Sequence, residues 1–225
     1  MKRTSYANLA RLWTAVEGRA EEREPEWTAR IRRSAEAQGI PQPPAAQGEL
    51  LELLVRLLGA RSVIAVVTGD VIDVLRLVDG LDGRGQVTAV DSSPEGIGLL
   101  RSLSGGLSGR TGTGLRAAKA APDVFLPRLN AGDYDLIVVG GAASNYAPAL
   151  AEAPRLLRAG GVIVFTDVMA LAHAEEDGGG VPDPVDRSAD TVAMRQLIDD
   201  ITQDERFDTA LTPSGTGTLI ARLRG

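Results

Sequence analysis

Apolar residues recur along this chain in two patterns, short continuous runs and helical stripes. Continuous runs rich in β-branched residues, each ending at a glycine or an aspartate, occupy residues 62–69, 86–91, 134–141 and 162–167. Such runs are typical of strands buried on both faces of a parallel sheet. Helical spacing predicts helices between and after them, at residues 48–58, 71–81, 92–103, 147–157 and 189–203. This alternation predicts an α/β fold with a doubly wound, mostly parallel sheet.

The two ends of the chain depart from this alternation. Leu9, Leu12, Trp13 and Val16 share one face of a helix predicted over residues 5–17. A second helix is expected at residues 25–38, followed by a proline-rich connector at 40–48. The sequence from 207 to 225 predicts two final strands around a glycine turn. Loops are expected at 104–114 and 173–188, and a short helix at 122–129.

Composition narrows the classes of function. The chain has no cysteine and one histidine, His173, which excludes disulfides and thiolate metal sites. The formal net charge is -6 and the basic residues form no long run, so no nucleic-acid partner is expected. No stretch of about 18 apolar residues occurs, so we expect a cytoplasmic protein without membrane contact.

Ligands of parallel α/β sheets bind beyond the carboxyl ends of the strands. Asp91 closes the second predicted strand there. In nucleotide-binding Rossmann-like domains an acidic residue at this place accepts hydrogen bonds from ribose hydroxyls. A turn or a helix cap ahead of Ser92 is an alternative role for Asp91, and both roles can coexist. The sequence lacks the G-x-G-x-x-G loop that an NAD-dependent oxidoreductase would need.

Several short words of the sequence, in order, resemble the S-adenosylmethionine-dependent O-methyltransferases, and most closely the catechol and caffeoyl-CoA type of actinobacteria. The resemblance runs from about Pro25 to the C-terminus. It rests on Q-G-x-L-L (47–51), G-A-R-S-V (59–63), Y-D-L-I-V-V (134–139), N-Y (145–146), R-L-L-R-x-G-G-V-I-V (155–164), A-D-T-V-A-M-R (189–195), D-E-R (204–206) and P-x-G-x-G-x-x-x-A-R (213–222).

The resemblance implies a Rossmann-like class I methyltransferase fold whose seven-stranded sheet includes one antiparallel strand near its end. It also implies a homodimer, with an N-terminal helical cap or dimerisation segment at residues 1–47 and the methyltransferase domain at 48–225. S-adenosylmethionine would be the cofactor. Its binding residues would be Val67, Thr68, Gly69, Asp73, Asp91, Ser92 and Gly140.

The cofactor loop departs from the family pattern E-x-G-T-G-x-G. Thr68 and Gly69 match it, whereas Ala65 replaces the acidic residue and Val67 and Val71 replace two glycines. Each valine would add a branched β-carbon beside the ligand, and valine is strained at positive φ. Asp70 would place a carboxylate beside the cofactor's own carboxylate. These changes predict weakened cofactor binding.

The metal site of the family, I-D-A-D-K on the third long strand and D-N after the fourth, is also altered. Gly140 and Ala143 replace the first aspartate and the lysine, and Thr166 and Asp167 replace the D-N pair. One carboxylate and one hydroxyl make a poor ligand set for Mg²⁺. We therefore expect no metal.

Chemistry would then depend on residues at the rim of the site. Asp167 and His173 are the candidate general bases, and Asn145, Tyr146 and Met169 are candidate contacts for a small-molecule acceptor. Asn145 could instead cap a helix, and Tyr146 could be a packing aromatic. The sequence thus favours methylation of a small-molecule hydroxyl without metal. The alternative is a catalytically inactive methyltransferase-fold protein that senses a ligand or binds a partner.

Overall fold

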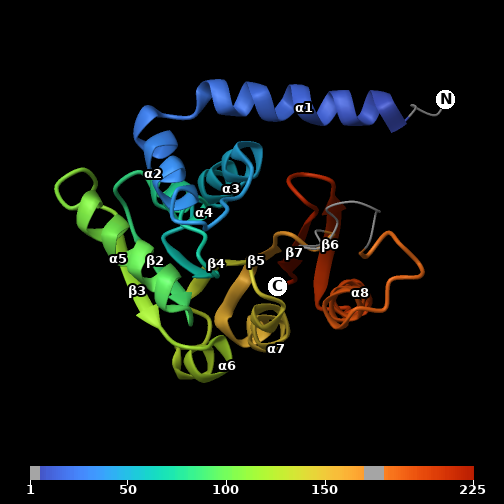
Figure 1. The fold of residues 1–225 in the computed structure, drawn as a ribbon. Helices are drawn as coiled ribbons and strands as arrows, with labels where there is room; N and C mark the ends of the chain where they lie inside the picture. Colours follow the sequence, from blue (N-terminus) through green and yellow to red (C-terminus); the bar gives the residue numbers. More distant parts are fainter. Residues whose placement is uncertain (1–5, 170–179) are drawn as a thin grey trace.

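The computed structural model describes residues 6–169 and 180–225, which form a sheet with helices on both faces (Figure 1). His173 lies outside the described residues. The sheet has seven strands in the order β3-β2-β1-β4-β5-β7-β6. The strands are β1 Ser62–Val66, β2 Gln86–Asp91, β3 Gly114–Lys119, β4 Tyr134–Val139, β5 Leu157–Phe165, β6 Phe207–Thr212 and β7 Thr218–Leu223. Strand β7 runs antiparallel to both of its neighbours, and β1 to β5 pair in parallel. The predicted fold class is confirmed.

Helices cover the sheet on both sides. They are α1 Tyr6–Arg23, α2 Glu26–Glu36, α3 Ala45–Leu58, α4 Ile72–Gly80, α5 Pro94–Leu107, α6 Pro122–Phe125, α7 Tyr146–Leu156 and α8 Ala189–Gln203, with short 3-10 turns at Leu126–Arg128 and Ala143–Asn145. One core lies between the sheet and helices α3, α4 and α5, and the other lies under α7 and α8. Side chains alternate between these cores along each inner strand: Val63 faces the first and Ile64 the second.

Several elements differ from the prediction; helix α1, for example, continues to Arg23, whereas the prediction ended at residue 17. Helix α5 continues to Leu107, which is buried, so the expected loop at 104–114 begins later. Strand β3 was not predicted because it is an edge strand that pairs with β2 alone and whose side chains are mostly half-exposed or exposed. Strand β5 begins at Leu157, where a helix end was expected, because Leu157 already pairs with Tyr134.

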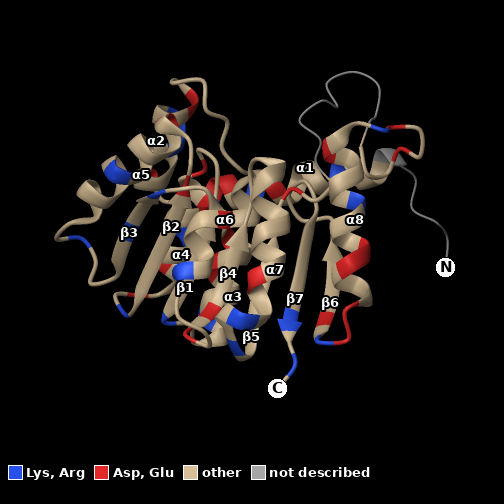
Figure 2. Ribbon diagram, turned by 90° about the horizontal axis from the view of Figure 1, so that it is seen from below, with Lys and Arg blue, Asp and Glu red and all other residues tan. Residues whose placement is uncertain are grey.

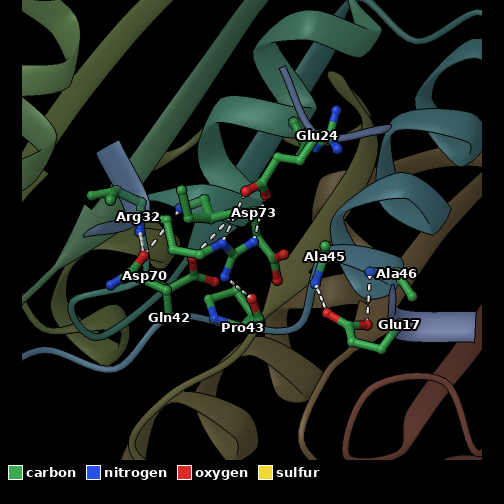
Figure 3. Close-up of polar contacts among 12 residues, drawn as sticks. Glu17, Glu24, Arg32, Gln42, Pro43, Ala45, Ala46, Asp70 and Asp73 are labelled. Carbon is green, nitrogen blue, oxygen red and sulfur yellow. Dashed lines mark hydrogen bonds and ion pairs between the residues drawn. The ribbon is translucent and has the colours of Figure 1, made fainter. Parts of the chain in front are cut away.

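Helix α1 does not bury the apolar stripe that its sequence predicts. Leu12, Trp13 and Val16 are 55%, 48% and 48% exposed, and Figure 1 shows α1 extending past the other helices toward the N-terminus. Polar contacts fasten its C-terminal half. Arg23 pairs with Glu49, and the Glu17 carboxylate accepts hydrogen bonds from the first backbone amides of α3 (Figure 3). The helix is therefore held by its end, with the stripe uncovered.

Charged residues of both signs are scattered over many elements (Figure 2). Within the described ranges, no helix combines the length and the hydropathy needed to cross a membrane.

Candidate functional site

A cavity of about 650 Å³ opens at the carboxyl ends of β1, β4 and β5. The proline-rich connector before α3 forms one wall, and α8 with the residues before it forms another. The lining residues are Pro41, Gln42, Pro43, Pro44, Thr68, Asp70, Gly141, Ala142, Ala143, Tyr146, Asp167, Asp186, Ser188, Asp190, Thr191, Met194 and Thr216. Among these residues four are aspartates and none is basic, so the cavity favours a cationic ligand.

The two valines of the loop after β1 do not face this cavity. Val67 and Val71 are each 1% exposed and belong to the core under α3, α4 and α5. Val71 has φ -108°, and the loop's one left-handed residue is Gly69 at φ 75°. The expectation that the valines obstruct a ligand or strain the backbone is therefore wrong. Their side chains turn inward because the core beneath the loop is apolar.

The connector holds this loop through one glutamine. The Gln42 amide donates to the Gly69 carbonyl at 3.0 Å, and its oxygen accepts from the amides of Val71 and Ile72 at 3.0 and 3.3 Å. Ile40 packs so closely that a β-carbon at Gly69 would lie 2.7 Å from it. The free amides at the start of α4 are thus satisfied within the protein rather than left for an anion.

Asp91 fastens the same loop from the side of β2. Its Oδ2 accepts from the Gly69 amide at 2.7 Å, and its Oδ1 accepts from the amide and hydroxyl of Ser93, both at 2.7 Å. Ser93 in turn caps α5, whereas Ser92 is exposed. The turn-forming role considered for Asp91 is therefore present. A carboxylate has about four acceptor sites, and three are filled here.

Thr68 ties the loop after β1 to the loop after β4. Its Oγ1 accepts from the Asn145 amide at 3.0 Å and from the Ala142 backbone at 3.2 Å. The Asn145 amide also donates to the Gly140 carbonyl at 2.8 Å. Asn145 makes no side-chain cap to α7, so its role is to join two loops. The result is a rigid floor for the cavity.

The metal position of the resembling family is filled differently. A β-carbon at Gly140 would lie 2.5 Å from Thr166 Oγ1, so the hydroxyl occupies the space of a longer side chain. Asp167 has φ 58° and accepts a hydrogen bond from the Thr216 hydroxyl. In residues 6–169 and 180–225, no cluster of three or more His, Cys, Asp or Glu side chains is arranged to hold a metal.

Of the residues predicted to contact the acceptor, Tyr146 lines the cavity and Met169 does not. Tyr146 lines the cavity, but its hydroxyl donates to the Thr166 carbonyl at 2.9 Å and its ring stacks on Phe165. Burial raises the pKa of Tyr146 far above its ordinary value, so it stays neutral. Met169 is not among the lining residues; it packs on Gly217 of the turn before β7, where a β-carbon would lie 2.5 Å from its Cγ.

Two aspartates lie together at the start of α4. Asp70 lines the cavity and its Oδ1 accepts from the Asp73 amide at 3.0 Å. The Asp73 carboxyl is buried behind it, where Gln47 donates to its Oδ2 at 2.7 Å. Burial, and then the charge of Asp167, raises the pKa of Asp70 to about 6. Burial, and then the charge of Asp70, raises the pKa of Asp73 well above its ordinary value. Asp73 therefore has no direct access to the cavity.

Comparison with known proteins identifies the family to which this chain belongs. The model of a family described as O-methyltransferase matches residues 21–224. A protein of Mycobacterium tuberculosis (strain H37Rv), named a probable O-methyltransferase, is 35% identical over 212 residues, which cover 93% of this chain and 89% of the relative. The chain belongs to the O-methyltransferase family.

Solved structures of other O-methyltransferases share the fold. One from Bacillus cereus, in complex with SAH, is 20% identical, with a TM-score of 0.78 over 95% of this chain and 99% of its own. The O-methyltransferase TomG from Streptomyces achromogenes, in complex with SAM, is also 20% identical, with a TM-score of 0.69 over 96% of this chain and 98% of its own.

Several residues of this O-methyltransferase-family site were not predicted. Hydrogen bonds connect Thr68, Gly69, Asp91, Gly140 and Asn145, and among these five only Thr68 is a lining residue of the cavity. Sequence analysis assigned no role to the connector glutamine or to the wall formed by Asp186 and α8. The proline-rich segment before Q-G-x-L-L was predicted to be a connector between two helices, and no role in the site was predicted for it. Nothing in the local pattern indicates which strand edge it covers.

Proposed function

We propose that this protein transfers a methyl group from S-adenosylmethionine to a hydroxyl of a small molecule, without a metal. The observation that carries the proposal is the cavity at the carboxyl ends of β1, β4 and β5, whose lining includes four aspartates and no basic residue. Membership of the O-methyltransferase family supports the reaction class. The structures of the related folds with SAH and SAM support the cofactor.

The residues of the cavity fit such a cofactor. When bound, S-adenosylmethionine supplies an electrophilic methyl group on a positively charged sulfur. A cation suits a cavity wall that holds Asp70 and Asp167 and, among its lining residues, no basic side chain. Gly141 lies in the wall at φ 82° and lets the backbone itself form the surface.

Each residue would then have a distinct task. Asp91 is 1% exposed and is not among the lining residues, so the loop after β1, which Thr68 and Gly69 shape, would have to open before the remaining acceptor site of Asp91 held a ribose hydroxyl. Asp167 would accept the proton of the acceptor hydroxyl, because its carboxylate lies at the cavity edge and the Thr216 hydroxyl orients it. The rate would then come mainly from holding the two reactants in line.

Binding of S-adenosylhomocysteine, measured by titration calorimetry, tests this proposal. We expect micromolar binding that is the same within about twofold in Mg²⁺ and in EDTA, since Gly140 and Thr166 stand where metal ligands would be needed. A screen of small phenols and catechols for methyl transfer would follow. Absence of binding at millimolar ligand would contradict the proposal and favour a catalytically inactive, partner-binding protein.

We also propose a homodimer formed through the N-terminal segment, residues 1–47. Its support is the uncovered stripe of Leu12, Trp13 and Val16 on α1. The variant Leu12→Asp is expected to shift the protein from dimer to monomer in sedimentation velocity. Val124→Asp is the matched control, because Val124 is 48% exposed and lies on α6, away from α1. A wild-type monomer at micromolar concentration would refute the dimer.

A further inference from the structure

We propose that Asp70 binds the ammonium group of the cofactor's methionine part, and that Asp73 behind it releases a proton to solvent when this cation binds. The inference rests on the proposed function and names a cofactor contact and a proton site within it. S-adenosylhomocysteine carries the same ammonium group and can therefore serve as the probe.

The position of Asp70 supports the first part of the proposal, the contact with the ammonium group. Asp70 follows the loop after β1 and lines the cavity, on the same side as Thr68 and Gly141. Its Oδ1 accepts a hydrogen bond from the Asp73 amide, which orients the carboxylate. The nearby helix-start amides are already bonded to Gln42. A cofactor carboxylate would find no free donors there, whereas its ammonium would find a fixed carboxylate.

The surroundings of Asp73 support the second part of the proposal, the release of a proton. Asp73 is 1% exposed, and its Oδ1 has no hydrogen-bond partner among the described residues. The Gln47 Oε1 beside it is also buried and unpartnered. A buried carboxylate oxygen without a donor is costly, and a proton on it removes the charge and supplies a donor. The charge of Asp70 raises the pKa of Asp73, so the two carboxyls titrate as one pair.

Charged groups of both signs surround the pair. Asp167 faces it from the end of β5 and favours protonation. Helix α3 and the connector present the neutral amides of Gln47 and Gln42. Arg32 on α2 is held by Glu24 and the Pro43 carbonyl (Figure 3). Arg76 on α4 is paired with Glu52 through Nη1, and its Nε and Nη2 are buried without a hydrogen-bond partner among the described residues. An ammonium ion in the cavity would add a positive charge on the side of Asp70.

The pH dependence follows from this arrangement. The pKa of Asp70 is raised to about 6 by burial. Below that pH Asp70 takes up a proton and loses its charge, so affinity for S-adenosylhomocysteine should fall as pH decreases from 7 to 5. Burial and the charge of Asp70 raise the pKa of Asp73 well above its ordinary value, so in this proposal Asp73 is the member of the pair that keeps a proton after Asp70 has lost its own. An arriving ammonium ion lowers the pKa of Asp73, and the proton leaves to the buffer.

Calorimetry with two ligands tests the assignment. At pH 7.5, Asp70→Asn should weaken S-adenosylhomocysteine binding about 10- to 100-fold, the range of a charge-assisted hydrogen bond. Binding of 5′-methylthioadenosine, which lacks the amino-acid part, should change by less than about twofold and shows that the variant is folded. Titration in buffers of different ionisation enthalpy should show proton release by the wild type and none by Asp73→Asn.

Asp199→Asn is the matched control, because Asp199 is an exposed aspartate of α8 that does not line the cavity. It should bind both ligands as the wild type does. Unchanged S-adenosylhomocysteine affinity in Asp70→Asn, or an equal loss of both ligands, would overturn the role of Asp70. Proton release that persists in Asp73→Asn would overturn the role of Asp73. Failure of the wild type to bind S-adenosylhomocysteine would instead refute the proposed function.

Discussion

Replacing Asp91 with alanine should abolish measurable binding of S-adenosylhomocysteine and lower the free energy of unfolding by about 2–3 kcal/mol. The carboxylate accepts three hydrogen bonds, from the Gly69 amide and from the amide and hydroxyl of Ser93. Without it, the buried Gly69 amide has no acceptor and the loop after β1 loses its anchor. The proposed ribose contact is lost at the same time.

A variant of a second buried aspartate, Asp135, separates the effect on folding stability from the effect on cofactor binding. Asp135 accepts hydrogen bonds from the Arg61 and Ser62 amides at 2.7 and 2.9 Å, and it lies at the start of β4, on the opposite edge of the sheet from the cavity. Asp135→Ala should lower the free energy of unfolding by a similar amount, about 2–3 kcal/mol, and leave cofactor affinity unchanged. Urea denaturation and calorimetry on both variants provide the comparison. Equal affinity in the two variants would show that Asp91 does not contact the ligand.

The second large effect is expected at Gly141. A β-carbon there would lie 2.8 Å from both the backbone nitrogen and Cβ of Thr68, and the residue has φ 82°. Gly141→Ala should therefore cost about 2–4 kcal/mol of folding free energy, by steric overlap and backbone strain together. Because Thr68 must move, the floor of the cavity moves with it. We expect cofactor affinity to fall at least about tenfold.

Gly132 supplies the matched control for this substitution. It has φ 69°, but a β-carbon there would meet nothing within 4 Å. Gly132→Ala should cost about 1–2 kcal/mol from the left-handed backbone alone and should not affect binding. Thermal unfolding and calorimetry on the pair separate backbone strain from the steric contact. If Gly141→Ala resembled Gly132→Ala in both measurements, the close packing of the two loops would be refuted.

The strands of the sheet illustrate what periodicity can predict. β1, β2, β4 and β5 are buried on both faces, so their sequences are continuous apolar runs and were recognised. β3 lies at the edge, with side chains largely half-exposed or exposed, and its sequence carries no such run. The helix predicted from the spacing of Leu12 and Trp13 is present, but periodicity does not indicate what covers the stripe, and both side chains are about half-exposed within one chain.

The cavity shows a further limit. Thr68, Gly69 and Asp91 were chosen because they follow predicted strands, and strand ends meet at one edge of a parallel sheet; Thr68 lines the cavity, whereas Gly69 and Asp91 are buried beside it. It misjudged Val67 and Val71, because whether a side chain turns to a ligand or to the core depends on the helices packed below the loop. The contacts of Gln42 with Val71, and of Gln47 with Asp73, span 29 and 26 residues.

The sequence by itself determined the α/β alternation, the strand ends that carry the site, and the replacements at Gly140 and Thr166. These follow from burial patterns and residue identities that act within a few residues. Only the tertiary structure decided that the connector closes the loop after β1 and that Asp70 faces a cavity while Asp73 is buried behind it. Such contacts depend on how distant segments pack, and local periodicity carries no record of that packing.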